Sequence, residues 1–462
     1  MAENSFNTAG LTQVSERTPL LRRLRMTGMV GVARRPLVDL LATVFGIGAW
    51  VAINGLWVEL PLLVTYLPEG WTLPSYLSVI IQVANVGPIA YSIVRSLRPD
   101  QRPASVVYGV LALGCVASLL LALLWDKTSW VNGTEHSTAL LSMVFLLALV
   151  DCTSSVLFLP YMAVWREIYL SSYLVGEGLS GLLPALMALG QGVGGNTKCA
   201  NVTKFNETLN FNYTVMEPVP LNPRFSVTSF FFFLMAMMVA SGLAFTLLEH
   251  LPTIRSERVV HTFSPSFSVT VLDASQSNAH LTSMPTVAKE KGGMSRSVYW
   301  LMLAGQTWAC SLTNGVLPSI QSYSCGAYGN VAYHLAVTLS ALANPAAALL
   351  SLVLPRTKRW LLTALGVLGS LIAAYILATA ALSPEPPLMG TAGGEALVVI
   401  AWVSFTGVMT YVRVEIANQM REEGQRALFW CGAVTQVGSA IGAVTTFILV
   451  NVYELFTAYY PC

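Results

Sequence analysis

The sequence predicts an all-α polytopic membrane protein with eleven transmembrane helices, six in an N-terminal half and five in a C-terminal half. Low charge, long uncharged stretches and recurring polar motifs are the three observations that predict it. Only 10% of the 462 residues are charged and 54% are hydrophobic, whereas a soluble domain carries about 25% charged residues. The composition therefore excludes a soluble enzyme, a disordered scaffold and a nucleic-acid binder.

The spans lie between the charged residues. A helix that crosses a bilayer needs about 20 mostly apolar residues. Eleven stretches meet this requirement, near residues 40–66, 72–94, 104–125, 138–160, 168–192, 225–248, 298–320, 331–354, 360–382, 394–412 and 427–450. The first and the fifth are longer than a span needs and contain Pro61 and Pro184. Kinked helices or an apolar hairpin outside the membrane would both explain the extra length.

The distribution of charge predicts the orientation. Eleven spans place the two chain ends on opposite sides. With a cytoplasmic N-terminus, 21 of the 25 lysines and arginines fall in cytoplasmic segments, as the positive-inside rule requires. Four N-glycosylation sequons fall in the two longest outside loops, at Asn132, Asn201, Asn206 and Asn212. We therefore expect a cytoplasmic N-terminus, an extracellular C-terminus and a multi-pass protein of the plasma membrane.

Five segments follow from these boundaries. We expect a disordered cytoplasmic tail (1–36), a six-helix bundle (37–249), a cytoplasmic linker rich in serine and threonine (250–296), a five-helix bundle (297–455) and an extracellular C-terminus (456–462). In the tail, Glu16 with Leu20 and Leu21 resembles an acidic dileucine signal that clathrin adaptors read; a chance match is the alternative. A genuine signal would add an endosomal or lysosomal pool.

Polar motifs recur in the two halves at a nearly constant offset. Many secondary transporters are built from internal repeats with the substrate site between them. The matched pairs are Asn54 with Asn314 and Gly178 with Gly438, both 260 residues apart, and Asn85 with Asn344, 259 apart. Parallel repeats of six spans describe the major facilitator architecture, which here lacks the twelfth helix.

Asp151 is the strongest candidate among the ionisable residues inside spans, because such residues are costly and commonly face an interior path. It lies mid-span and shares one helical face with Ser154 and Ser155. We therefore expect a polar stripe that faces the bundle interior. A structural hydrogen bond between helices is the alternative.

Four further ionisable residues lie in spans. Glu177 is flanked by glycines and either contributes to the site or holds the fifth helix against the eighth. Glu59, in the outer part of the first span, is an outer gate residue or an interfacial anchor. His334 and Glu395 lie near outer helix ends, where we expect the membrane interface.

Amides complete the polar set. The side chains of Asn54, Gln82, Asn85, Asn314 and Asn344 can pair with an uncharged polar ligand or join helices by hydrogen bonds. The chain has no Walker A loop, no spacing of histidine, cysteine and aspartate suited to a metal, and no Ser–His–Asp set. We expect no catalytic residue, no metal, no cofactor and no enzymatic activity.

Four uninterrupted strings carry a resemblance to a known family. They run from Ile53 to Val64, Leu149 to Val156, Gly176 to Leu186 and Leu312 to Ser319, within a likeness that covers about residues 40–455 apart from the glycosylated loop and the linker. The chain resembles the vertebrate riboflavin transporter family of solute carriers. The resemblance implies facilitated or proton-sensitive uptake of riboflavin at the cell surface. We expect riboflavin and membrane lipid as partners and a monomeric state.

The chemistry of riboflavin fits this residue set. Amides match its uracil-like edge, Trp57 or Tyr323 can stack on its ring, and Asp151 with Thr153, Ser154 and Ser155 suits the ribityl hydroxyls. Because the ring is neutral, no positive clamp is needed, and we expect none in the spans. The expected substrate-binding residues are Asn54, Trp57, Glu59, Gln82, Asn85, Asp151, Ser154, Glu177, Asn314, Gln321 and Tyr323.

Two other functions remain open at this point. An equilibrative nucleoside transporter has the same eleven-span layout and also binds a neutral base with a polyol. A non-transporting cell-surface receptor is the other class. The disulfide pattern is open as well, because Cys199, Cys325 and Cys462 are the three thiols on the oxidising side and any two of them can pair.

The orientation leads to a first testable prediction. An epitope tag after Cys462 should be stained by antibody on intact cells, whereas a tag before Met1 should require permeabilisation, because an odd number of spans separates the two ends. Reversed staining would exclude the eleven-span topology.

The tail leads to a second prediction. Replacing both Leu20 and Leu21 with alanine should move the protein from endosomal or lysosomal membranes to the cell surface, measured by surface biotinylation. Replacement of the neighbouring Leu24 is the control. An unchanged distribution would mean that the dileucine match arose by chance.

Overall fold

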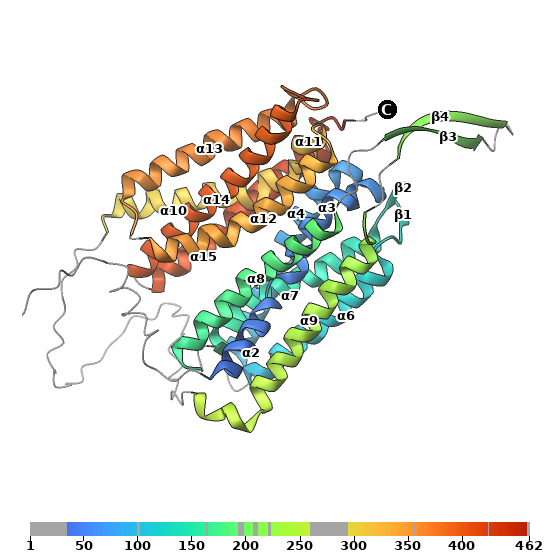
Figure 1. Ribbon diagram of the computed structural model, residues 1–462. Coiled ribbons are helices and arrows are strands. Elements are labelled where there is room, and N and C mark those ends of the chain that lie inside the picture. Colours follow the sequence, from blue (N-terminus) through green and yellow to red (C-terminus); the bar gives the residue numbers. More distant parts are fainter. Residues whose placement is uncertain are drawn as a thin grey trace, which may run out of the picture.

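The computed structural model describes residues 35–98, 102–162, 165–192, 198–206, 211–219, 223–258, 294–354, 356–423 and 425–459. Long helices dominate it and form two bundles that lie beside each other (Figure 1). One bundle contains the elements before the linker, in blue to lime, and the other contains those after it, in yellow to red.

Within the described residues, the N-terminal half comprises eight α-helices and two short 3₁₀ segments. Their bounds are α2 (Pro36–Ile47), α3 (Val51–Tyr66), η1 (Gly70–Thr72), α4 (Leu73–Val83), α5 (Val86–Leu97), α6 (Pro103–Leu124), α7 (Thr138–Met162), α8 (Glu167–Gln191), α9 (Val227–His250) and η2 (Pro252–Glu257).

Among the described residues, the C-terminal half comprises six α-helices and one π-helical turn. Their bounds are α10 (Arg296–Ser311), the π turn η3 (Leu312–Val316), α11 (Leu317–Gly326), α12 (Asn330–Val353), α13 (Arg359–Ala381), α14 (Ala392–Glu422) and α15 (Gln425–Asn451).

Two antiparallel hairpins project from one end of the bundles, which we call the hairpin end (Figure 1). They are β1 (Ser129–Val131) with β2 (Thr134–His136), and β3 (Lys198–Asn206) with β4 (Phe211–Val219). The asparagines of all four sequons lie on these hairpins. Asn132 occupies the first turn, exposed and with a φ of 51°, and Asn201 is exposed on β3. The opposite end, where α9 ends and α10 begins, is the linker end.

The structure confirms a helical polytopic membrane protein but not the exact number of spans. Within the described residues, nine helices are long and apolar enough to cross a membrane, and the bent pair α2–α3 makes ten. The consecutive run α10–η3–α11 covers the predicted seventh span but fails the same test of length and composition. Polar residues along it, such as Gln306 and Asn314, lower its hydropathy.

The first predicted span is a kinked helix, as its length suggested. α2 and α3 meet at a break over residues 48–50 and differ in direction by 53°. Pro61 is not the cause, because it lies inside α3, and Pro184 likewise lies inside α8. The second span is also interrupted, between α4 and α5 at Ala84 and Asn85.

The tenth predicted span was too short. The sequence placed its end at residue 412, but α14 continues to Glu422, because residues 413–423 contain no proline or glycine. Arg413 therefore lies within a candidate span rather than in a cytoplasmic loop. The expectation that the spans contain no fixed positive charge was wrong.

Corresponding helices of the two halves pack in the same pattern. α2 packs against α8 and α6 against α7, as α10 packs against α15 and α13 against α14. Across the interface between the halves, α8 contacts α12 and α4 contacts α15. These matching pairs support the internal repeat.

An aromatic cluster forms the core of the N-terminal half beside the α2–α3 break. Phe45 of α2 packs against Phe158 and Tyr161 of α7, Tyr173 of α8 and Phe245 of α9, with ring centroids 4.6–6.0 Å apart. Stacked and edge-to-face rings at such distances stabilise a core beyond the area they bury. The break is thus held between four helices.

The start of the predicted linker packs on the N-terminal half. Glu257 pairs with Arg35 and Arg166 at 3.1 Å each. The next residue, Arg258, pairs with Glu249 at 2.6 Å and lies 5.0 Å from the centre of the Trp165 ring. Residues 252–258 therefore belong structurally to the first bundle.

Candidate functional site

Asp151 of α7 satisfies a backbone donor at the start of α3. One carboxylate oxygen accepts a hydrogen bond from the N–H of Ile53 at 3.1 Å, and the side chain has no exposed surface. The first N–H groups of a helix have no partner within that helix, and in an apolar interior each one left free is costly. Asp151 thus acts as an N-terminal cap supplied by another helix, where the helix dipole also favours negative charge.

Two serines satisfy carbonyl groups at the end of α2 in the same way. Ser154 of α7 donates to the carbonyl of Ala49, and Ser241 of α9 donates to that of Phe45, both at 2.9 Å. Asp151 and Ser154, both predicted as substrate ligands, therefore contact the α2–α3 break. Their burial and orientation follow from that contact.

The polar stripe expected on α7 does not form one surface. Ser154 turns to Ala49, Thr153 donates to the carbonyl of Leu149 at 2.6 Å, and Ser155 is exposed. The second carboxylate oxygen of Asp151 has no hydrogen-bond partner among the described residues. The hydroxyls predicted to gather around a polyol are thus divided among three directions.

Two amide–serine pairs occupy matching places in the two halves. The Asn54 side chain of α3 donates to the Ser180 hydroxyl of α8 at 3.1 Å. The Asn314 side chain of η3 donates to the Ser439 hydroxyl of α15 at 3.0 Å. Asn314 lies 260 residues after Asn54, and Ser439 lies 259 after Ser180. The asparagines were predicted from the sequence but the serines were not, although a nearly equal offset relates them.

Arg413 is a site residue that the sequence analysis missed. Its guanidinium donates to the Thr313 hydroxyl at 2.9 Å and to the Asn314 side-chain carbonyl at 3.1 Å. Its buried Nε has no partner among the described residues. The unbroken helical pattern up to Gly424 is the signal that could have identified it. Arg413 in one half thus corresponds to Asp151 in the other, since each contacts the interrupted first helix of its own half.

Gln82 and Asn85 lie together at the α4–α5 break. The Asn85 amide donates to the Gln82 carbonyl at 3.2 Å and approaches its side-chain oxygen at 3.4 Å. Gln82 and Asn85 are both half-buried. Polar side chains in the middle of a span are expected to face the bundle interior or a water-filled cavity rather than lipid. Trp57 of α3 is half-buried as well.

Glu177 lies on the face of α8 that meets the C-terminal half. It is half-buried, one turn from Ser180 and Gly181. A Cβ at Gly181 would lie 3.5 Å from the Asn54 amide and 3.8 Å from the Ala341 carbonyl of α12. The small residues of α8 therefore let three helices approach around Asn54.

Asn344 and the glycines that relate the two halves contact neighbouring helices. The Asn344 side chain accepts a hydrogen bond from Thr410 at 2.9 Å, which joins α12 to α14. A Cβ at Gly438 would meet the Thr307 carbonyl at 2.3 Å, and one at Gly176 would meet the Thr43 carbonyl at 2.0 Å. Gly176, rather than the predicted Gly178, therefore makes the close helix approach that matches Gly438.

Glu59 and His334 both lie inside the protein. Glu59 is 1% exposed and accepts a hydrogen bond from the Gln191 amide at 2.9 Å, which joins α3 to the end of α8. His334 of α12, also buried, donates through Nε2 to the Ala188 carbonyl of α8 at 3.0 Å. The expected interfacial position of His334 was wrong, because α8 covers this end of α12. Glu395 is half-buried in the first turn of α14.

The two predicted residues of α11 are buried near the hairpin end. Tyr323 packs edge-to-face on Trp71, with ring centroids 5.8 Å apart, and lies 5.6 Å from the Phe456 ring. Gln321 is 6% exposed. The ring of Tyr323 is therefore already engaged by protein side chains in this conformation.

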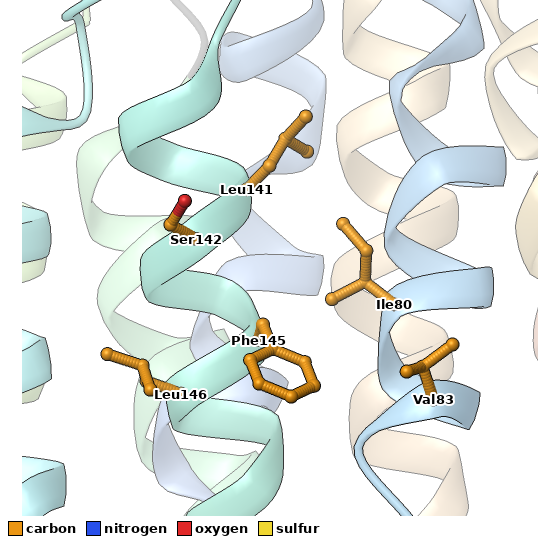
Figure 2. Close-up of a pocket in the computed structure, with 6 residues that line it drawn as sticks. All are labelled: Ile80, Val83, Leu141, Ser142, Phe145 and Leu146. Carbon is orange, nitrogen blue, oxygen red and sulfur yellow. The ribbon is translucent and has the colours of Figure 1, made fainter.

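An apolar groove between α4 and α7 differs in chemistry from these residues (Figure 2). Figure 2 shows Ile80 and Val83 of α4 facing a row on α7. The groove measures about 470 Å³ and is lined by Ile80, Val83, Leu141, Ser142, Phe145 and Leu146. A single hydroxyl cannot match the donors and acceptors of a uracil-like edge. The groove does not correspond to the predicted substrate site.

The structure restricts the disulfide pairing of the cysteines and bears on metal binding. Cys199 is disulfide-bonded, whereas Cys325 is a free and fully buried thiol. The two pairings that use Cys325 are therefore excluded. Within the described residues, no group of three or more histidines, cysteines, aspartates or glutamates could hold a metal ion.

The chain matches known transporters in sequence. The profile of solute carrier family 52, riboflavin transporter, matches residues 34–458. The zebrafish (Danio rerio) riboflavin transporter, member 3-B, is 46% identical over 91% of this chain and 97% of its own length. The human members 3 and 2 are 41% and 39% identical, covering 91% and 93% of this chain and 97% of their own lengths.

The fold also matches a solved structure. A crystal structure of the nucleoside transporter NupG superposes with a TM-score of 0.53 and covers 90% of this chain and 92% of that one. The sequences are only 10% identical, so the likeness concerns the fold alone.

The cap at the α2–α3 break leads to a third prediction. Asp151→Ala leaves the Ile53 N–H without an acceptor, which costs about 1–3 kcal/mol, whereas Asp151→Asn retains an acceptor oxygen. We expect lower thermal stability of the detergent-solubilised protein and a lower surface level for the alanine variant, and a smaller change for the asparagine variant. Ser155→Ala is the control, because Ser155 is exposed on the same helix. If Asp151→Ala melts like the parent protein, Asp151 does not cap α3.

Proposed function

Since the chain belongs to the riboflavin transporter family of solute carriers, we propose that it carries riboflavin across the membrane by alternating access between its two halves. The protein is a transporter and not an enzyme. The matches extend over both halves, so neither half is an addition to a shorter domain. Riboflavin transport is the function that the family supports, and a nucleoside transporter or a non-transporting receptor is not favoured.

The observation that carries the proposed mechanism is the pair of interrupted helices in matching positions. Asn54 and Asn314 lie at these interruptions, each held by one serine of its own half. Substrate sites of secondary transporters commonly form where such helices meet at a repeat interface. We infer that the flavin binds between the halves, with these two amides on opposite sides of it.

The half-buried residues around this interface are the proposed ligands. The Asn54, Asn314 and Gln82 amides offer both donors and acceptors to the uracil-like edge, and Trp57 offers an aromatic face for the ring. Arg413 supplies donors only, and these match the two carbonyl oxygens of that edge. Asp151 then acts on transport by positioning α3, and Tyr323 acts near the hairpin end.

The proposed topology keeps eleven spans. The run α10–η3–α11 would be the eleventh, since a polar face towards the interface explains its low hydropathy. The sequons on both hairpins support an extracellular hairpin end and a cytoplasmic linker end, and with them a cytoplasmic N-terminus, an extracellular C-terminus and residence in the plasma membrane. The dileucine motif of the tail lies outside the described residues, and adaptor binding and a monomeric state stay predictions.

The two amide–serine pairs lead to a fourth prediction. Asn314→Ala removes a ligand contact and a helix contact, whereas Ser439→Ala removes only the helix contact. If Asn314 binds riboflavin, KM for uptake of labelled riboflavin should rise about 2- to 10-fold more in Asn314→Ala than in Ser439→Ala. This additional rise corresponds to the loss of one neutral hydrogen bond to the substrate. Asn54→Ala and Ser180→Ala form the matched second comparison.

Two measurements accompany that comparison. Surface biotinylation corrects each rate for the amount of protein at the surface. Competition with flavin analogues and with nucleosides identifies the substrate class, and nucleosides should not compete. Equal KM values in the asparagine and serine variants would assign the amides to helix packing alone, and competition by nucleosides but not by flavins would overturn riboflavin as the substrate.

A further inference from the structure

Trp71 of the N-terminal half is inserted against the C-terminal half at the hairpin end. Its indole lies edge-to-face on Tyr323, and its backbone carbonyl accepts a hydrogen bond from the Ser322 hydroxyl at 2.5 Å. The ring also lies over Gly326, where a Cβ would meet it at 2.1 Å. Ser322 and Tyr323 are buried by this contact, at 0% and 3% exposure. The last turn of α11 is therefore covered by one side chain from the opposite half.

The turn that carries Trp71 is anchored to its own half. Glu69 accepts hydrogen bonds from the backbone N–H of Ser137 at 2.7 Å and from its hydroxyl at 2.6 Å. Gly70 has a φ of 51°, which a side chain would disfavour. These contacts fix η1 relative to α7, so Trp71 moves with the N-terminal bundle rather than with α11.

A second set of contacts joins α4 to α15 at the same end. The Asn451 amide donates to the Ser75 hydroxyl at 2.7 Å, and Ser75 is fully buried. Next to it, Tyr76 packs perpendicular to Phe447, with ring centroids 5.2 Å apart. The hydrogen bond from His334 to the Ala188 carbonyl joins α12 to α8. Three pairs of elements thus close the hairpin end.

Towards the linker end, α5 does not join the two halves as α4 does, within the described residues. α4 packs against α11 and α15, whereas α5, which continues the same span towards the linker end, packs principally against α7. Exposed apolar residues follow along α5, among them Ile89, Ile93 and Leu97. Within the described residues, α4 thus joins the two halves near the hairpins, whereas α5 makes no comparable contact with the C-terminal half.

We propose that Trp71 and the Ser75–Asn451 contact form the hairpin-end gate of the transporter, which must separate each time the site opens on that side. This inference rests on the proposed alternating access. Trp71 and Tyr323 are positioning residues that seal the path, so the role of Tyr323 is closure and not flavin stacking. Because both contacts join the halves, they break together when the bundles rotate apart.

The first experiment locks the gate. Ser75→Cys with Asn451→Cys is introduced into a full chain that also carries Cys199→Ser, which removes the native disulfide of Cys199. A protease site is added in the linker (259–293), so that only an oxidised engineered pair keeps the halves joined after cleavage. We expect cross-linking under mild oxidation and a fall in riboflavin uptake of at least about tenfold, the scale of about 1.4 kcal/mol, reversed by a reductant. Ser129→Cys with Thr138→Cys is the matched control, since these hydroxyls lie 2.8 Å apart within one half.

The second experiment weakens the gate. Trp71→Ala in the double-cysteine chain should slow cross-linking by about tenfold, because an aromatic contact and its buried area are lost from the closed state. Trp360→Ala is the control, since Trp360 is 68% exposed on α13, and it should cross-link like the parent.

The outcomes separate the gate from the proposed function. Failure of the cysteine pair to cross-link, full uptake by the cross-linked protein, or equal cross-linking rates in Trp71→Ala and Trp360→Ala would each overturn the gate. If the unsubstituted chain reaches the surface and takes up no riboflavin, the proposed function fails. The cross-linking rates, which need no substrate, still decide whether Trp71 closes the hairpin end.

Discussion

The need to satisfy backbone hydrogen bonds at interrupted helices, away from water, determines much of this structure. A span that breaks inside a membrane exposes N–H and C=O groups that lipid cannot bond. At the α2–α3 break, Asp151, Ser154 and Ser241 meet these groups from two neighbouring helices. Their polar character is therefore compatible with an apolar core, and the positions of α7 and α9 are fixed by it.

The two halves place opposite charges against their interrupted first helices, although only Asp151 contacts a backbone group, whereas Arg413 contacts side-chain oxygens. A carboxylate on α7 contacts Ile53, and a guanidinium on α14 contacts Thr313 and Asn314. Since residues 53 and 313 are 260 apart, the charges occupy related places in the repeat. A buried charge is costly unless it is hydrogen-bonded, so each must remain near its helix. A neutral substrate between the halves would then lie in a polarised environment without a bound ion.

Contacts within a half are stronger than the contacts between the halves. Within the first bundle, Glu257 ties the segment after α9 to Arg35 and Arg166. Between the bundles, the contacts at the hairpin end are single hydrogen bonds and ring contacts, such as Trp71 with Tyr323. Each contributes about 1 kcal/mol. Motion by alternating access requires such a difference, because the halves must separate without unfolding.

The sequence by itself determined the helical membrane class and the family and predicted the repeat, because charge-free stretches and long uninterrupted motifs are local properties that survive any packing. It also identified Asn54 and Asn314 as related. Only the tertiary structure decided what the polar residues do. Asp151 caps α3, Ser155 points away, His334 is buried, and Arg413 lies inside a span. The partner of a buried polar atom comes from a distant helix, and one sequence does not encode which helix lies opposite.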